Sequence, residues 1–455
     1  MSTLAMLQPA IAPAALTCLL LSWSSPAAAA GEVGNTAPDR VVAAPAVADV
    51  GRLTWVESTP VETDLDLPGV PETAAVWRDV LGAARDSVEV LAFYLSEDPA
   101  GRDPLEPVLA ALQTAGDRGV VVRVLADRGF HRTYPEIARQ LDAAPGIAVR
   151  LLDARALWGG VQHAKAFAVD GRRFFVGSQN WDWRALMHIH ELGALVESPE
   201  LTRRFRAVFA GDWDRAQPLA VAEAAAGSPG GTPRTSAPAE AIEGVQQPAA
   251  GPGTALPPVP LVTAAGDTVH AVLGASPPQA LPPGVPWDEP LLVHLLDGAR
   301  RRIRVQLLSY NPSDRDGGYW AVLDDALRRA AARGVDVQMI LADWSQRESM
   351  LVYVQSLAVL PRIEIRFTSI PPWSGGFVPF ARVEHAKYVT VDDERCWLGT
   401  SNWSGGYFRE SRNLSLFLEG EGACAVPDAF FEQSWNSAYA ATVDPCGRYT
   451  PPRRQ

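Results

Sequence analysis

The chain contains two copies of one polar motif, and this duplication constrains the fold more than any other feature of the sequence. Each copy begins with a His-Ala-Lys triplet, at His163 and at His385, and the residues that follow recur at equal distances. A Lys lies two residues after each His, an Asp seven, a Gly fourteen and an Asn seventeen. Chance does not produce agreement at so many positions, so we interpret the chain as two repeats of one structural unit.

The two halves also share an order of predicted secondary structure. Apolar runs at 88–95 and 303–310 predict buried strands that end in Tyr, and a helix is expected at 105–115 in the first half. A second strand follows an Arg-Gly-Val turn in each half, at 120–125 and 335–341. Strands that alternate with helices predict βαβ units and a mixed or parallel sheet.

Composition divides the chain into segments. A stretch rich in Pro, Ala, Gly and Ser predicts a linker over residues 217–260, between a first lobe at 52–216 and a second lobe at 261–445. Residues 446–455 are expected to form a C-terminal tail. With 455 residues and a hydrophobic share of 47%, the chain is long and apolar enough for two packed domains.

The N-terminus has the pattern of a secretion signal. An apolar stretch from Ala10 to Trp23 precedes a run of alanines that ends before Gly31, so we predict a cleaved signal peptide at 1–30. The segment before the apolar stretch lacks Lys and Arg, which leaves a misassigned start codon or an uncleaved anchor as alternatives. No other stretch is long and apolar enough to span a bilayer, so we expect a secreted or periplasmic protein.

Three cysteines follow the signal segment, and export would permit disulfides. The spacing favours a pair between Cys424 and Cys446, which would hold the C-terminal segment. Cys396 lies in an apolar run and is expected to be a buried thiol. Because spacing alone supports this pairing, other pairings stay open.

The motif residues suit chemistry at a phosphodiester. Side chains alternate along a strand, so the His and Lys of each triplet point to one face, and two packed halves would double the set around one cavity. The formal net charge of -12 argues against a general nucleic-acid coat, but it is compatible with a small basic site. The predicted catalytic side chains are His163, Lys165, His385, Lys387, Asn180, Asn402 and Glu191.

The expected mechanism uses both histidines. One neutral His attacks phosphorus to form a phosphohistidine, while the other, protonated, donates to the leaving oxygen. Water or an alcohol then attacks the intermediate. The lysines and the neutral amide and hydroxyl donors stabilise charge that a divalent metal would otherwise neutralise, so we predict no metal and no cofactor.

Other residues near the motifs have weaker signals. Glu191 and Asn413 both lie twenty-eight residues after a motif His, so the two histidines should have different partners and different roles. Asp170 and Asp392 are expected to be structural. Residues predicted to bind substrate are Ser178, Ser401 and Trp373, the last on a Pro- and Gly-rich loop that would rim the cavity.

The pattern His-x-Lys-x4-Asp followed by Gly-(Ser/Thr)-x-Asn resembles the phospholipase D superfamily over roughly residues 53–439. Segments 56–60, 93–94 and 399–405 are similar to the branch of the animal phospholipase D family members three and four. Members of that branch are described as lysosomal single-strand 5′-exonucleases, with some reports of lipid transphosphatidylation.

This resemblance implies an α/β fold of two pseudo-symmetric α/β/α lobes, each with a mixed β-sheet, in a monomer with the active site at the lobe interface. It also implies that His163 is the nucleophile and His385 the general acid/base. The symmetry of the sequence leaves the reverse assignment open.

Three functions fit these observations. The first is a phosphodiesterase on single-stranded nucleic acid, and the second is a phospholipase or transphosphatidylase on lipid head groups. The third is a binding protein that captures phosphorylated ligands without catalysis, which the two complete motifs disfavour. The branch resemblance favours the nuclease, whereas an apolar patch at the mouth of the site would favour the lipid enzyme.

Overall fold

The computed structural model describes residues 50–101, 103–226 and 256–454. All of these residues belong to one unit by their internal contacts. The predicted signal peptide at 1–30 and most of the predicted linker lie outside the described residues. Within the described part, no helix has both the length and the apolar composition needed to cross a membrane.

The first lobe is built on a mixed sheet in which β2, β4 and β5 are parallel and the remaining neighbours are antiparallel. Its spatial order is β10 (Gln217–Pro218), β5 (Ile147–Leu152), β4 (Val121–Asp127), β2 (Ser87–Ala92), β6 (Ala166–Val169), β7 (Arg173–Gly177), β9 (Ile189–Glu197) and β1 (Gly51–Ser58).

The second lobe repeats this arrangement. Its strands β13, β14 and β15 are parallel, and the others join them antiparallel. The spatial order is β20 (Ala440–Thr442), β15 (Ile363–Thr368), β14 (Asp336–Ala342), β13 (Arg302–Leu307), β17 (Tyr388–Val391), β18 (Arg395–Gly399), β19 (Asn413–Glu419) and β12 (Thr268–Ser276).

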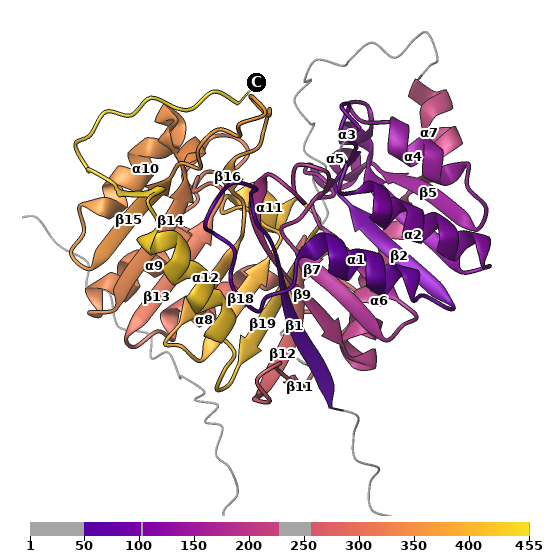
Figure 1. The fold of residues 1–455 in the computed structure, drawn as a ribbon. Helices are drawn as coiled ribbons and strands as arrows, with labels where there is room; N and C mark the ends of the chain where they lie inside the picture. The colour runs from indigo at the N-terminus through magenta and orange to yellow at the C-terminus, as the bar shows by residue number, and fades with distance from the viewer. Residues whose placement is uncertain (1–49, 102, 227–255, 455) are drawn as a thin grey trace, which may run out of the picture. The chain divides into compact units, whose positions relative to one another are not determined.

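One short strand joins the two sheets. β11 (Val259–Val262) pairs parallel to β1 and antiparallel to β12, so the sheets of the two lobes are continuous through it (Figure 1). Three very short strands lie outside this order: β3 (Leu95–Ser96) pairs with β8 (Trp181–Asp182), and β16 (Val383–Glu384) pairs with β9 of the other lobe.

Helices cover both faces of each sheet because strand residues alternate between two cores. Val88 and Val90 of β2 pack in one core with three helices of the first lobe, whereas Leu91 packs in another core with α6 (Pro199–Arg215). The three helices of the outer face are α1 (Thr73–Gly82), α2 (Glu106–Asp117) and α4 (Glu136–Asp142). Short helices α3 (Arg128–His131), α5 (Ala154–Trp158) and α7 (Leu219–Ala226) complete this lobe.

The second lobe is layered in the same way. One core contains its outer helices α8 (Asp288–Asp297), α9 (Val322–Ala332) and α10 (Glu348–Ala358). Its inner helix α12 (Ala425–Asn436) packs in the same central core as α6, so one core spans both lobes. Two 3-10 helices, at Pro278–Ala280 and Asp343–Gln346, and the short α11 (Gly405–Arg409) lie in its connections.

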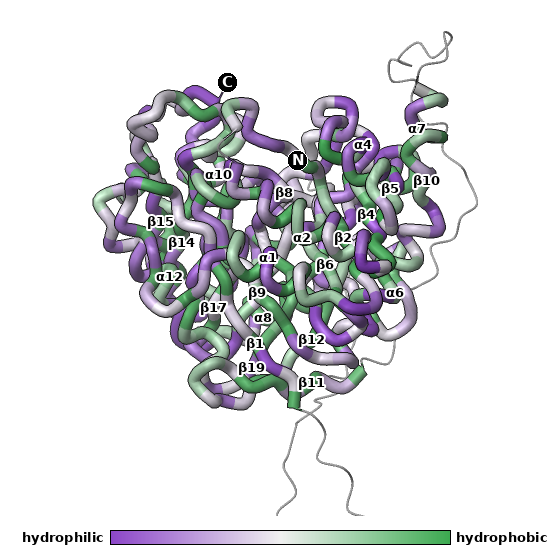
Figure 2. Tube along the Cα trace, turned by 45° about the vertical axis from the view of Figure 1, so that its right-hand side comes forward, coloured by the Kyte–Doolittle hydropathy of each residue, from purple (hydrophilic) through white to green (hydrophobic). Residues whose placement is uncertain are grey.

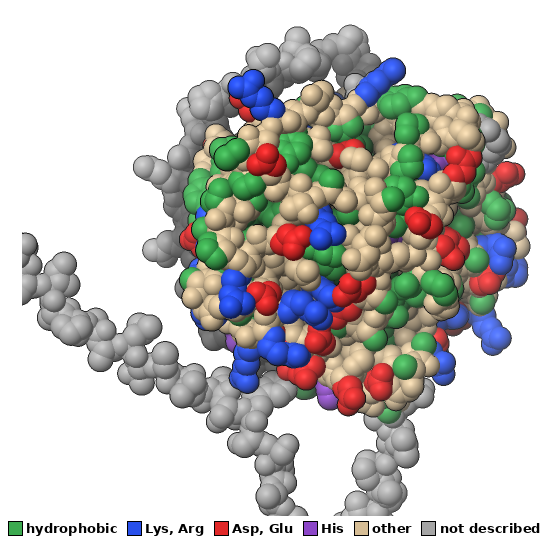
Figure 3. Space-filling model, turned by 60° about the vertical axis from the view of Figure 1, so that its left-hand side comes forward, with side chains coloured by type: hydrophobic (Ala, Val, Ile, Leu, Met, Phe, Trp, Pro, Cys, Tyr) green, Lys and Arg blue, Asp and Glu red, His purple; other side chains and the backbone are tan. Residues whose placement is uncertain are grey.

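Local sequence explains where the central helix α6 begins. Ser198 precedes it and accepts a hydrogen bond from the backbone N–H of Leu201, and Pro199 occupies its first position. Figure 2 shows hydrophobic residues gathered along the strands and hydrophilic ones in the connections. On the face drawn in Figure 3, acidic and basic side chains are interspersed rather than gathered by sign.

The predicted fold class is confirmed, and so are the individual strands and helices that the sequence pattern indicated. The apolar run at 88–95 is divided into β2 and the short β3, and its counterpart ends at Leu307. Residues 217–226 were expected to belong to the linker, but they form β10 and α7, which pack against β5.

The predicted disulfide between Cys424 and Cys446 is wrong, because both residues are free thiols in the structure. Cys424 is buried in the central core beside Cys396, and burial together with a hydrogen bond to Cys424 raises the pKa of the Cys396 thiol. Cys446 is exposed in the C-terminal segment. The spacing was misleading because α12 carries the chain away from Cys424 before it reaches Cys446.

The motif aspartates hold turns at the outer end of each sheet. Asp170 and Asp392 both adopt positive φ, at 54° and 55°, and their carboxylates accept hydrogen bonds from successive backbone N–H groups. The donors are those of Arg85, Asp86 and Ser87 for Asp170, and of Arg300, Arg301 and Arg302 for Asp392. Each Asp therefore fixes the turn between a helix and the strand next to its own.

A buried ion pair ties the lobes together. Arg412 of the second lobe is fully buried, and its Nε and Nη2 donate to the two carboxylate oxygens of Asp212 on α6, at 2.6 and 2.8 Å. Its remaining donors reach the carbonyl oxygens of Ser276 and Ala280. Such a pair is held by geometry that satisfies all its partners, so removing one partner leaves an uncompensated buried charge.

We expect Arg412→Ala to lower the free energy of unfolding by about 3–5 kcal/mol, because Asp212 would keep its buried charge without a partner. Urea denaturation measures this loss. The matched control is Arg329→Ala, which breaks an exposed pair with Asp297 and should cost less than about 1 kcal/mol. Equal losses in the two variants would contradict the role given to Arg412.

Candidate active site

Strand pairing between the lobes brings the two motif histidines into one site. The backbone N–H of His163 donates to the carbonyl oxygen of Arg412, and that of His385 donates to the carbonyl oxygen of His190, both at 2.9 Å. Each motif is thus attached to a strand of the other lobe. Burial lowers the pKa of both histidines, and the charge of the lysine from the other motif lowers each further, as expected for side chains that surround one site.

Each histidine ring also has a partner from the other lobe. His163 Nδ1 lies 3.0 Å from Asn413 Oδ1, and His385 Nδ1 lies 2.7 Å from Glu191 Oε2. The prediction that Glu191 accepts a hydrogen bond from one of the two rings agrees with this contact. Asn413 takes the matching place beside His163, so the two histidines have different partners, as the equal offsets indicated.

The hydrogen bonds of Asn413 fix the tautomer of His163. Asn413 Nδ2 donates to the carbonyl oxygen of Tyr407 at 2.7 Å, so its Oδ1 faces His163 and also accepts from the Thr400 hydroxyl at 2.8 Å. Because an amide oxygen only accepts, His163 Nδ1 must carry the hydrogen. The other ring nitrogen, Nε2, is then free to act as a nucleophile in the neutral ring.

The electrostatic surroundings of the two histidines differ. Burial lowers the pKa of His163 well below its usual range, and the charges of Lys165 and Lys387 lower it further. Burial also lowers the pKa of His385, but the charge of Glu191 opposes this shift. His163 is therefore held neutral, whereas His385 has a carboxylate that stabilises its protonated form.

The two motif lysines are fully buried. Lys165 Nζ donates to the carbonyl oxygen of His163 at 2.5 Å, and Lys387 Nζ donates to that of His385 at 2.6 Å. Burial and the charge of Lys387 lower the pKa of Lys165 well below its usual range, and burial lowers the pKa of Lys387 to about 7. An anion bound between them would favour their charged forms, and a phosphate group is such an anion.

The neutral polar residues of the motifs divide into two groups. Asn180 and Asn402 are nearly buried, and within the described residues their side-chain oxygens, like the Ser401 hydroxyl, have no hydrogen-bond partner. The Ser178 hydroxyl instead lies 3.2 Å from both the N–H and the carbonyl oxygen of Leu192, so it holds β9 in place.

Trp373 lies on the segment that crosses from the second lobe to the first. Its ring centroid is 4.9 Å from that of His188, and its neighbour Ser374 hydrogen-bonds to Glu62 through both backbone and side chain. This position is next to β9, where the Trp373 ring packs against His188. Its role in substrate binding stays a prediction.

Aromatic rings enclose His163, and little in the sequence pointed to them. Phe93 and Tyr407 pack edge-on against its ring, with centroids 4.8 and 4.7 Å away. Phe93 also lies under Lys165, whose Nζ is 4.7 Å from the ring centroid. The signals for Phe93 were its place at the end of the repeated strand and the family resemblance of segment 93–94, whereas Tyr407 had none.

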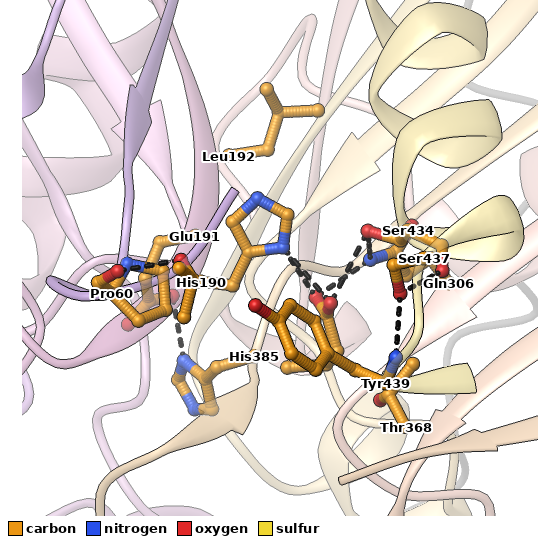
Figure 4. Close-up of polar contacts among 12 residues, drawn as sticks. Pro60, His190, Glu191, Leu192, Gln306, Thr368, His385, Ser434, Ser437 and Tyr439 are labelled. Carbon is orange, nitrogen blue, oxygen red and sulfur yellow. Dashed lines mark hydrogen bonds and ion pairs between the residues drawn. The ribbon is translucent and has the colours of Figure 1, made fainter. Parts of the chain in front are cut away.

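A second histidine–carboxylate pair lies directly beside the first. His190 and Glu191 are adjacent in β9 and point to different partners, as Figure 4 shows. His190 Nδ1 lies 2.9 Å from both carboxylate oxygens of Glu384, and Gln306 donates to the same carboxylate at 2.7 Å. Burial disfavours a charge on His190, but Glu384 outweighs it and raises its pKa. This pair holds β9 against β16. Because Glu191 follows His190 in β9 and His385 follows Glu384 in β16, it also holds Glu191 in contact with His385.

No metal site accompanies these residues in the described ranges, where no three His, Cys, Asp or Glu side chains are grouped to hold an ion. The pair of His188 and His190 therefore lacks the further ligands that a metal ion would need.

Most of the chain is similar to known proteins. The family described as "Cardiolipin synthase, PLD-like domain" matches residues 78–213 and 292–435, one match in each lobe. The chain is 30% identical to 5′-3′ exonuclease PLD3 of Homo sapiens over 416 residues, which cover 86% of this chain and 80% of that protein. It is also 30% identical to 5′-3′ exonuclease PLD4 of Mus musculus over 426 residues, with the same coverage.

Among solved structures, phosphatidylserine synthase of Haemophilus influenzae Rd KW20 has a similar fold. Its TM-score is 0.53 at 14% identity, and the match covers 81% of this chain and 85% of that one. At this identity the likeness concerns the fold alone.

The partners of the histidines predict opposite responses to two isosteric changes. Glu191→Gln should lower the pKa of His385 further, because it removes the carboxylate that opposes burial. Asn413→Asp should raise the pKa of His163, because it adds a negative charge 3.0 Å from Nδ1. NMR titration of the imidazole groups measures both shifts. Unchanged values for both histidines would contradict the assigned contacts.

Proposed function

Because the chain belongs to the phospholipase D superfamily, in the branch that includes PLD3 and PLD4, we propose that it cleaves single-stranded nucleic acid. The chain is a phosphodiesterase of that superfamily, and the proposed reaction passes through a phosphohistidine intermediate. The observation that carries this proposal is the unequal pair of histidines beside two buried lysines. One ring is fixed as a neutral tautomer by Asn413, and the other is paired with Glu191.

The proposed reaction proceeds in two displacements. In the first, His163 Nε2 attacks phosphorus, a P–N bond forms, the bond to the leaving oxygen breaks, and His385 donates a proton to that oxygen. In the second, His385 takes a proton from water, the resulting hydroxide attacks phosphorus, and the P–N bond breaks. The contrast between the partners of the two histidines supports this assignment over the reverse one.

Charge on the phosphoryl oxygens is stabilised by the motif residues in this proposal. A bound anion favours the protonated forms of Lys165 and Lys387, whose pKa values burial lowers, and the side-chain Nδ2 groups of Asn180 and Asn402 donate to the phosphoryl oxygens. Since the lysines do the work that a divalent cation does in many phosphoryl transferases, the reaction should proceed without added metal.

The substrate class is proposed from the relatives and from the aromatic surroundings of His163. The printed names of PLD3 and PLD4 describe 5′-3′ exonucleases, and aromatic rings beside a phosphate site favour unpaired bases, which stack on them. Phospholipid head groups remain the alternative substrate. We further propose that the chain is exported, supported by the signal-like segment at 1–30, and that it acts as a monomer, as the family resemblance implies. N-terminal sequencing of the exported protein should then begin at Gly31.

The test is an assay with chelator present, in which the purified protein is offered single-stranded oligonucleotides and, separately, phosphatidylcholine vesicles. We expect cleavage of the oligonucleotides and a loss of at least about 1000-fold in His163→Ala and in His385→Ala, because each removes a reacting group. Arg329→Ala serves as the control and should keep full activity, because Arg329 lies on α9, outside both motifs, and pairs with Asp297. Cleavage of the vesicles alone would select the lipid enzyme, and loss of activity with chelator would contradict the metal-free reaction.

A further inference from the structure

A cavity with an excess of arginines lies in the first lobe, against the segment that leads to His163. Its volume is about 380 Å³, and it lies between the segments that follow β4 and β5 and the segment that leads to the motif. We call it the arginine pocket and define it by Arg128, Phe130, Arg132, Arg155 and Val161, which all line it. None of these residues belongs to the duplicated motif.

The arginine pocket and the reacting histidine share one segment of chain. Val161 lines the pocket two residues before His163, and two residues of extended chain span at most ~7 Å. This segment is fixed on both sides: Asp127 accepts from the N–H of Gln162 at 2.8 Å, and Val161 accepts from the N–H of Arg412 at 2.9 Å. The wall of the pocket at Val161 is thus fixed relative to the nucleophile.

Charge in the pocket is net positive once its internal pairs are counted. Two carboxylates line it, but Asp153 is paired with Arg128 at 3.1 Å, and Asp127 accepts hydrogen bonds from three backbone N–H groups. Arg132 and Arg155 are exposed, and in the described part of the chain neither makes an ion pair. Two such guanidinium groups over a cavity form a suitable site for a phosphate.

An aromatic ring completes the site. Phe130 lines the pocket with 37% of its surface exposed, which is unusual for a large apolar side chain. Its ring centroid lies 4.0 Å from that of Phe93, which in turn packs against His163 at 4.8 Å. Aromatic contacts therefore connect the nucleophile to the pocket, and Phe130 offers an exposed ring to an unpaired base.

We propose that the arginine pocket binds the nucleotide next to the scissile phosphate, with Arg132 and Arg155 on its phosphate and Phe130 against its base. This inference rests on the proposed nuclease function and adds a second contact to it. The protein should accordingly prefer substrates with more than one phosphate, although the chemistry requires only one.

The test compares two substrates that differ only in the neighbouring phosphates. Thymidylyl-thymidine has a scissile phosphate and no other, whereas oligothymidylate has neighbours on the chain. The variant R132A/R155A should raise KM for oligothymidylate about tenfold with kcat unchanged, and the slope of log(kcat/KM) against log salt should fall by about 0.7 for each lost phosphate contact. Activity on thymidylyl-thymidine should stay within about twofold of the wild type.

The controls separate the possible failures. Arg329→Ala removes another exposed arginine, from α9 of the second lobe, and should change neither substrate. Equal losses on both substrates, or no loss on oligothymidylate, would overturn the pocket's role. If R132A/R155A loses activity only on vesicles that contain phosphatidylglycerol, the arginines contact a lipid surface, and the proposed nucleotide contact is overturned as well. If the wild type cleaves neither thymidine substrate, the proposed function itself fails, which is a different result.

Discussion

The exchange of hydrogen bonds between the two lobes is the constraint on which the rest of the structure depends. Glu191 of the first lobe holds His385 of the second, and Asn413 of the second lobe holds His163 of the first. Backbone hydrogen bonds from the same two motifs cross the interface beside them. Neither half has a complete site alone, so the repeated sequence is useful only when both lobes are docked. The buried pair of Arg412 and Asp212 and the shared central core explain how that docking is maintained.

The two buried lysines lower the stability of the folded state when they are charged, which is consistent with a site that binds an anion. Burial lowers the pKa of Lys165 and of Lys387, which means that the folded state disfavours their charged forms relative to the unfolded chain. Between a pH of about 7 and the ordinary pKa of lysine, the folded protein binds fewer protons at Lys387 than the unfolded chain does. For this group, stability therefore rises with pH across that interval and is lowest below it. A bound phosphate would remove this penalty, because its negative charge favours the protonated lysines.

The sequence predicted the lobes, their strands and the residues that meet at the interface, because a repeat with equal offsets leaves few arrangements that bury both halves. It did not predict which lobe supplies the partner of each histidine, since that depends on how the lobes dock. The hydroxyl of Ser178 was expected to face substrate, but its contacts with Leu192 depend on the turn after β7. The predicted pairing of Cys424 with Cys446 was wrong because the burial of the Cys424 thiol beside Cys396 is a property of the packed core. The arginine pocket was not foreseen either, as its residues come from three separate segments.

The proposed chemistry requires that one histidine becomes covalently attached to the substrate phosphate while the other moves protons. The most direct measurement is peptide mass spectrometry on the His385→Asn variant after incubation with an oligonucleotide and an alkaline quench, which preserves a P–N bond. We expect a nucleotide adduct on the peptide that contains His163, and no adduct when His163→Ala is added. An adduct found only on other peptides, or no adduct in a variant that still releases one equivalent of product, would contradict this mechanism.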